Sequence, residues 1–176
     1  MVLFHSLAQP PFYYHKQFGQ KWCAFVIVIR LTFDGSLTLH SSKRTAILIA
    51  MGNGHSACDS VLYLPDDQVM FAADLLFVKS HPSVQSGNVT EWIEIVDRLC
   101  EKSFHTVVPG HGPVGKKKDI ALLQQYLCAL TERVQAYASV EQIAGTPIPE
   151  LYQEWSVPSL YERNLLHLFH QLSTTS

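Results

Sequence analysis

The chain has 176 residues, of which 47% are hydrophobic and 16% are charged, so it holds enough apolar material for one globular domain and is not expected to be disordered. Its formal net charge of -2 gives no basic surface of the kind that nucleic-acid-binding domains carry. The apolar run from Trp22 to Ile29 is too short to span a bilayer. We therefore expect a protein that binds neither nucleic acid nor a membrane.

The cysteines show no Cys-X-X-Cys spacing, which argues against a thiolate zinc site or a redox motif. Scattered free thiols are typical of a reducing compartment, so the cytoplasm is the expected location. The four residues concerned are Cys23, Cys58, Cys100 and Cys128.

The N-terminal 21 residues show no clear hydrophobic period, and Pro10-Pro11 interrupts them. We treat residues 1–21 as an irregular segment and residues 22–176 as the domain. From Trp22 to Phe33 the content of β-branched and apolar residues is high, which predicts a buried strand.

The next part of the chain predicts a series of strands joined by short turns. Asp34-Gly35 is a hairpin signal. Alternation predicts a half-buried strand, and continuous apolar runs predict buried ones. The predicted strands are Ser36 to His40, Arg44 to Ala50, Val61 to Leu64 and Val69 to Ala73, and a loop is expected from Leu75 to Gly87.

The remainder of the chain alternates between helices and a strand. Asn88 to Glu91 resembles a capping box ahead of a helix whose apolar stripe includes Trp92 and Leu99. The further predicted elements are a strand from Phe104 to Val108, a helix from Lys118 to Val140 that Gly145-Thr146-Pro147 would stop, and a helix with Leu165, Leu168, Phe169 and Leu172 on one face. Strands followed by alternating strands and helices predict a mixed α and β domain.

Three side chains lie where predicted strands end: His55 after Gly54, Asp74 after Val69 to Ala73, and His111 within Pro109 to Pro113. Each has a plain structural explanation when taken alone: a loop histidine bonded to backbone, a turn cap, or a ring packed between glycines. Together they form a ligand set of two imidazoles and a carboxylate, which suits zinc and also non-haem iron. Asp59, four residues after His55, is expected to support the loop or a ligand as an outer partner.

The order Gly-His-Ser, Tyr-Leu-Pro, Phe-Ala-Ala-Asp and Pro-Gly-His-Gly-Pro resembles the C-terminal half of the metallo-β-lactamase superfamily. The resemblance implies a β-sandwich flanked by helices, an α/β (α+β) class. It also implies that His55, Asp74 and His111 bind one or two zinc ions, with Asp74 between the two when both are present. The implied activity is hydrolysis of an ester, thioester, lactam or related bond in a small-molecule substrate by metal-bound water.

One motif of the resembled family, His-X-His-X-Asp-His, is absent, because no two histidines of this sequence are separated by a single residue. An alternative is therefore a truncated or degenerate, non-catalytic member that acts as an interaction module. With three candidate ligands we expect weak zinc binding, unless His5, His15 or His40 completes a two-metal site.

Three of the predicted strands are apolar on both faces, as in a sheet that is covered on both sides: Trp22 to Leu31, Arg44 to Ala50 and Val69 to Ala73. The predicted helices can cover only one face. We therefore expect self-association through the other face, a homo-oligomer, unless Phe4 to Phe18 folds back to cover it.

Overall fold

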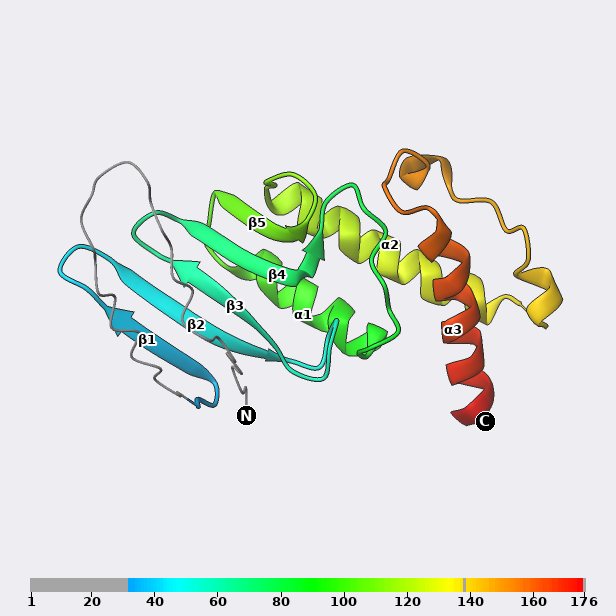
Figure 1. Ribbon diagram of the computed structural model, residues 1–176, viewed down its shortest axis with the longest axis horizontal. Coiled ribbons are helices and arrows are strands. Elements are labelled where there is room, and N and C mark those ends of the chain that lie inside the picture. Colours follow the sequence, from blue (N-terminus) through cyan, green and yellow to red (C-terminus); the bar gives the residue numbers. More distant parts are fainter. Residues whose placement is uncertain (1–31, 138, 176) are drawn as a thin grey trace, which may run out of the picture.

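The computed structural model describes residues 32–137 and 139–175, which form one five-stranded sheet packed with helices (Figure 1). The strands lie side by side in chain order, the first four antiparallel to their neighbours and the fifth parallel to the fourth. They are β1 (Ser36–His40), β2 (Thr45–Gly52), β3 (Asp59–Leu64), β4 (Val69–Phe77) and β5 (Thr106–His111).

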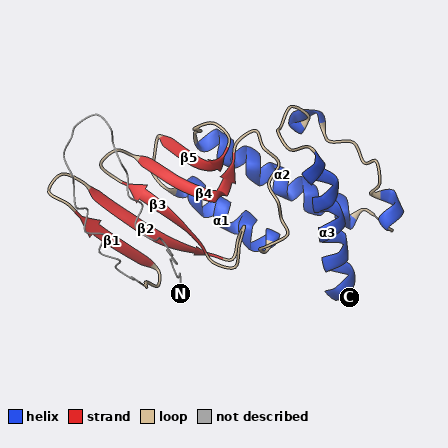
Figure 2. Ribbon diagram, viewed as in Figure 1, coloured by secondary structure: helices blue, strands red, loops and turns tan. Residues whose placement is uncertain are grey.

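The helices follow the pattern that a parallel strand pair requires. Helix α1 (Val89–Glu101) carries the chain from β4 back to the start of β5, and α2 (Lys117–Gln135) packs beside α1. Helix α3 (Ser159–Thr175) packs on α2 away from β1, and two short 3-10 turns, η1 (Val140–Gln142) and η2 (Glu150–Tyr152), join α2 to α3 (Figure 2). The mixed α and β class is confirmed. No described helix is both long and apolar enough to cross a bilayer.

Several predicted boundaries were wrong, and three of them matter for the site and the helices. Strand β4 does not end at Asp74 but runs to Phe77, because Phe77 pairs with His111 after an irregularity at Ala73. The predicted loop therefore begins only after Phe77. By the same pairing, β5 extends to His111. Helix α2 ends at Gln135, before the predicted Val140. Tyr137, two residues after this end, bonds through its hydroxyl to Thr146 at 2.9 Å, in the segment that follows the helix. Residues 1–31, with most of the predicted first strand, lie outside the described residues.

The start of α1 differs from the predicted capping box in one bond. The Asn88 side-chain oxygen accepts from the backbone N–H groups of Thr90 at 3.0 Å and Glu91 at 3.2 Å, as an N-cap should. The Glu91 carboxylate accepts from the Asn88 side-chain amide instead of its backbone N–H. That N–H is already used, since it donates to the carbonyl of Gly54 at 3.0 Å. The N-cap residue Asn88 thus connects the start of α1 to the loop after β2 through this backbone hydrogen bond.

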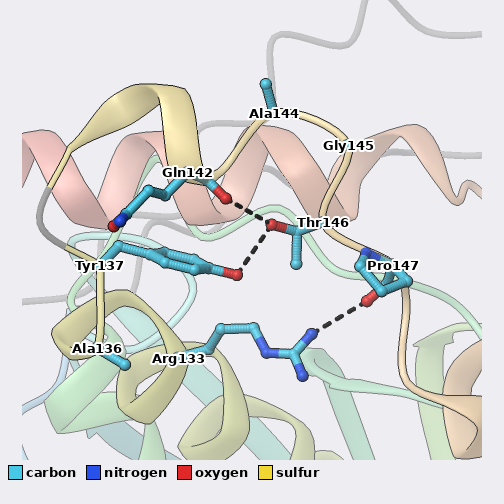
Figure 3. Close-up of a pocket in the computed structure, with 8 residues that line it drawn as sticks. All are labelled: Arg133, Ala136, Tyr137, Gln142, Ala144, Gly145, Thr146 and Pro147. Atoms are coloured by element: carbon cyan, nitrogen blue, oxygen red, sulfur yellow. Dashed lines mark hydrogen bonds between the residues drawn. The ribbon is translucent and has the colours of Figure 1, made fainter.

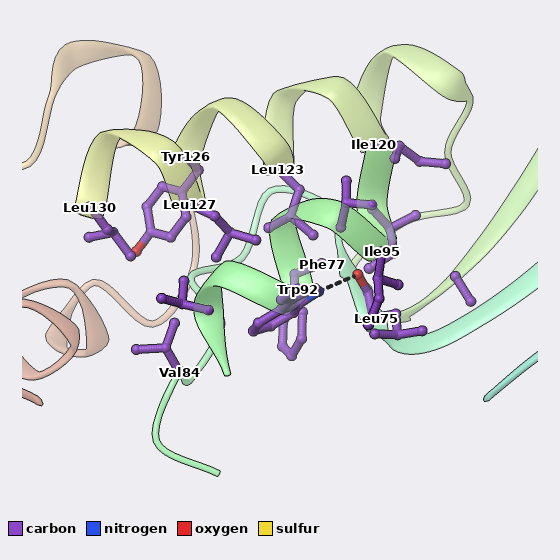
Figure 4. Close-up of a cluster of buried hydrophobic side chains, with 14 of the residues drawn as sticks. Leu75, Phe77, Val84, Trp92, Ile95, Ile120, Leu123, Tyr126, Leu127 and Leu130 are labelled. Carbon is purple, nitrogen blue, oxygen red and sulfur yellow. Dashed lines mark hydrogen bonds between the residues drawn. The ribbon is translucent and has the colours of Figure 1, made fainter. Parts of the chain in front are cut away.

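The hydrophobic core lies between the sheet and the two helices (Figure 4). Trp92 of α1 is fully buried, and its indole N–H donates to the carbonyl of Leu75 at 3.0 Å. The sheet residues on this side, Val61, Met70, Ala72 and Val107, are buried as well. This face is the one that the helices cover.

The opposite face of the sheet is also apolar. The strand register aligns one residue from each strand in a continuous row: Leu37, Leu48, Leu62, Phe71 and Val108. On β1 only this face is apolar, because the alternate positions are Ser36, Thr38 and His40. Phe71 is 38% exposed, and the described helices pack on the other side of the sheet.

We therefore predict that the protein self-associates through this row. Light scattering should report a mass above 19.8 kDa. A Leu48→Glu variant should shift the protein towards the monomer, because a charge placed in a closed apolar interface is costly.

The matched control is Thr38→Glu, which places the same charge on the other face of β1 and should leave the mass unchanged. A wild-type chain that is monomeric at every concentration would contradict the prediction.

Candidate metal centre

Three of the predicted site residues lie along one edge of the sheet. Strand β2 ends at Gly52, which pairs with Asp59 at the start of β3, and Phe77 near the end of β4 pairs with His111. Three parts of the chain therefore meet at the same edge: the loop that holds His55, the last residues of β4 and the end of β5. His40 pairs with Thr45 at the opposite edge and does not reach this site, whereas His5 and His15 lie outside the described residues.

Asp74 and His111 form the closest pair. The Nε2 atom of His111 lies 3.5 Å from Oδ1 of Asp74, and the side chains are 59% and 47% exposed. Ala73, with a φ of 47°, turns the backbone just before Asp74. Residue 110 must be glycine here, because a Cβ at Gly110 would overlap Oδ1 of Asp74 and the backbone of Ala73.

The separation of this pair fits two ligands of one metal ion. Zinc bonds to imidazole nitrogen and carboxylate oxygen are about 2.0–2.2 Å long, so two such ligands at a tetrahedral angle lie roughly 3.4 Å apart. A separation of 3.5 Å is long for a direct hydrogen bond. The chemistry of the donors and their spacing therefore both suit a zinc ion held between Asp74 and His111.

His55 lies in a loop that Asp59 holds in shape. One carboxylate oxygen of Asp59 accepts from the backbone N–H groups of Gly54 and Ser56, both at 3.0 Å, and the other accepts from the Ser56 hydroxyl at 2.6 Å. Residues on both sides of His55 are thus tied to one side chain. Gly87 presses against the same loop, where a Cβ would overlap the carbonyl of Gly54.

Both imidazoles rest on the same aromatic ring. The ring of His111 stacks on Phe77 with a centroid distance of 4.8 Å and an angle of 14°. The ring of His55 lies 5.7 Å from Phe77 and meets the edge of Trp92 at 5.3 Å. Phe77 and Trp92 form the floor of the site. From the sequence, Trp92 was expected only in the apolar stripe of its helix. Phe77 had no expected role, because its pairing with the strand of His111 is not visible in any local pattern.

The three predicted ligands are not one compact cluster. Within residues 32–137 and 139–175, no three His, Cys, Asp or Glu side chains are grouped closely enough to hold a single metal ion. Asp74 and His111 are paired, whereas His55 contacts Phe77 and Trp92. Cys58 is exposed in the His55 loop, and His81 is buried elsewhere.

Comparison with known proteins gives the family. The sequence profile of the Metallo-beta-lactamase superfamily matches residues 10–111, more than half of the chain and all three predicted ligands. The chain belongs to the metallo-beta-lactamase superfamily. A metallo-beta-lactamase type 2 from Bacteroides fragilis is 31% identical over 90 residues, which are 47% of this chain and 35% of that protein.

Solved structures support the fold of this superfamily member. A metallo-beta-lactamase from Pontibacter korlensis matches 55% of this chain with a TM-score of 0.51 at 24% identity. The enzyme TMB-1 matches 56% of it with a TM-score of 0.50 at 16% identity. The chain spans about a third of the length of the curated relative and 47% of each of these two structures.

We predict that Asp59→Asn loosens the His55 loop. The amide keeps only one acceptor oxygen, so at least one of the three bonds is lost or weakened, at a cost of about 1–3 kcal/mol in unfolding free energy. Amide hydrogen exchange at Gly54 and Ser56 should speed up. Glu154→Gln removes an exposed carboxylate far along the chain and is the control. Unchanged exchange in Asp59→Asn would show that Asp59 does not hold the loop.

Proposed function

We propose that this chain provides the metal-binding edge of a zinc-dependent hydrolase, with His55, Asp74 and His111 as ligands. The observation that supports this most strongly is the 3.5 Å separation of Asp74 Oδ1 and His111 Nε2, which suits two ligands of one zinc ion. Superfamily membership supports the same metal. The set of two histidines and a carboxylate also suits iron, so the choice of zinc as the metal is itself part of the proposal.

Each residue has a separate part in this proposal. Asp74 and His111 bind the ion from neighbouring parallel strands, and their half-exposed side chains leave the ion open to water and substrate. His55 approaches from its Asp59-bound loop. Phe77 fixes the plane of the His111 ring, so that Nε2 keeps its direction towards the carboxylate. This packing is the support that metal-binding histidines need when their donor atom must stay in place.

A bound zinc ion would lower the pKa of its water towards about 7 and polarise a substrate carbonyl. The proposed substrates are therefore small molecules with a hydrolysable acyl bond, namely esters, thioesters, lactams and related groups. The fold does not choose among them.

A second candidate is a non-catalytic interaction module. Two observations favour it: the sequence has no His-X-His-X-Asp-His motif, and the described residues hold no group of three ligands. Under this alternative Asp74 and His111 would bind a metal weakly or not at all.

Zinc titration by calorimetry tests the proposal. We predict that the wild type binds fewer than two zinc ions per chain, and that His111→Ala and Asp74→Asn each weaken the affinity at least about tenfold, because each removes one of few ligands. Affinity should also fall as the pH falls, since imidazoles coordinate only when neutral.

The matched control is His40→Ala, which removes an imidazole at the opposite edge of the sheet and should leave the affinity unchanged. Zinc binding that is identical in wild type and His111→Ala would contradict the proposed site. Binding without hydrolysis of any acyl substrate would favour the interaction module, and two tightly held zinc ions would mean that further ligands complete the site.

A further inference from the structure

The C-terminal part of the chain is fastened to the segment that leaves β4. The backbone N–H of His81 donates to the carbonyl of Ser156, and the N–H of Ser156 donates to the carbonyl of Lys79, both at 3.0 Å. Ser80 and Ser156 form a parallel bridge. These bonds join residues about 75 positions apart, so they attach η2 and α3 to the edge of the sheet.

The side chain of His81 lies inside this junction. It is 1% exposed, and its Nδ1 atom lies 2.9 Å from the hydroxyl of Tyr126 on α2. The rings of Tyr126, Trp155 and Tyr161 stand around it at centroid distances of 5.4, 5.6 and 6.0 Å. One imidazole therefore contacts α2, the turn after η2 and α3 at once. Its Nε2 atom has no well-aligned hydrogen-bond partner.

The groups around His81 do not favour a positive charge. The titratable groups around it are the phenols of Tyr126 and Tyr161, whose rings contact His81, and that of Tyr152, whose backbone bonds to it. Burial raises the pKa of all three phenols, so they stay neutral. A charged side chain of this cluster, Arg133, is a cation that donates to the Tyr161 hydroxyl at 3.2 Å. Asn164 of α3 is fully buried and donates to the carbonyl of Pro82 at 2.7 Å. The described contacts thus supply no carboxylate to pair with an imidazolium.

Protonation would also disturb the hydrogen bond to Tyr126. The neutral ring can accept the Tyr126 proton at Nδ1, whereas an imidazolium carries a proton on both nitrogens and can only donate. The Tyr126 hydroxyl would then have to turn its own proton elsewhere within a buried cluster. Burial lowers the pKa of His81 below its ordinary value of 6.5, and the backbone of Tyr152 offsets part of this effect.

We propose that His81 acts as a pH-sensitive latch at the junction of Lys79 to His81 with Ser156. Its protonation releases η2 and α3 from the segment that follows β4, while the sheet and α1 stay folded. The proton comes from solvent and is taken up at Nδ1 when the junction opens. Because the closed form disfavours the charge, the latch is fully stable above the open-state pKa near 6.5. Its stability falls as the pH drops from there towards the lower pKa of the closed form.

The latch adjoins the candidate metal centre. The backbone N–H of Val78 donates to the carbonyl of His111 at 2.9 Å, and Val78 directly precedes the latch residues Lys79 to His81. An open latch therefore loosens the backbone next to one proposed ligand. Through this coupling, a fall in pH would affect the metal centre by opening the latch, in addition to any effect on the ligands themselves.

Two other hollows lie elsewhere on the helices. One, about 530 Å³, lies at the C-terminal end of α2, opens widely to solvent, and has bonds among its own lining residues, such as Tyr137 to Thr146 and Arg133 to Pro147 (Figure 3). The other, about 720 Å³, lies between α1, α2 and α3.

Amide hydrogen exchange of the whole chain at pH 7.5 and pH 5.5 tests the latch. After correction for intrinsic exchange rates, protection of the His81 and Ser156 amides should fall by up to about tenfold per pH unit below 6.5. The amides of Val96 and Leu99 inside α1 should keep their protection. The wild type alone therefore separates local opening from general acid unfolding.

The variant His81→Gln keeps a hydrogen-bonding side chain without a titrating ring, and its Ser156 protection should not depend on pH. His81→Phe, which fills the same space without polar atoms, should behave likewise if the glutamine variant folds poorly. His105→Gln replaces an exposed imidazole and should retain the wild-type fall. A wild type without the fall, or a pH-dependent His81→Gln variant, would overturn the proposal.

Discussion

The parallel pairing of β5 with β4 is the constraint on which the rest of the structure depends. It requires α1 to carry the chain from one end of the sheet to the other, and so places Trp92 beneath the edge where both strands end. The same pairing sets His111 opposite Phe77. Without this pairing, the carboxylate of Asp74 and the imidazole of His111 would not be brought next to each other.

The strand irregularity at Ala73 completes this arrangement. A residue with a φ of 47° shifts the register between Ala73 and Phe77, so the ladder resumes beyond Asp74 instead of ending there. Gly110 on the facing strand leaves the space that the carboxylate occupies. The Asp74 carboxylate is thereby held half-exposed within β4, just before its buried last residues, at a place where a cation can reach it. The aromatic cluster around His81 has the opposite character, because it buries an ionisable ring among neutral groups.

Many of the helices and strands, and the order of the candidate ligands, could be predicted from the sequence, because local residue patterns indicate them. The alternation of Ser36 to His40, the Asn88 cap and the Trp92 stripe each gave the correct element. The order of His55, Asp74 and His111 with their flanking glycines gave the superfamily. The role of Phe77 and the length of β4 were not predictable in this way, because both depend on pairing with a strand about 35 residues later. The burial of His81 depends on contacts with α2 and α3, which no local pattern around His81-Pro82 contains.

We propose that the edge formed by β4 and β5 holds a metal ion between Asp74 and His111. Anomalous diffraction at the zinc absorption edge, from crystals grown with one equivalent of zinc, tests it most directly. We expect an anomalous peak within about 2.2 Å of both Asp74 Oδ1 and His111 Nε2, with the His55 ring turned towards it. Zinc located elsewhere, with these two side chains bonded directly to each other, would show that Asp74 and His111 do not form a metal site.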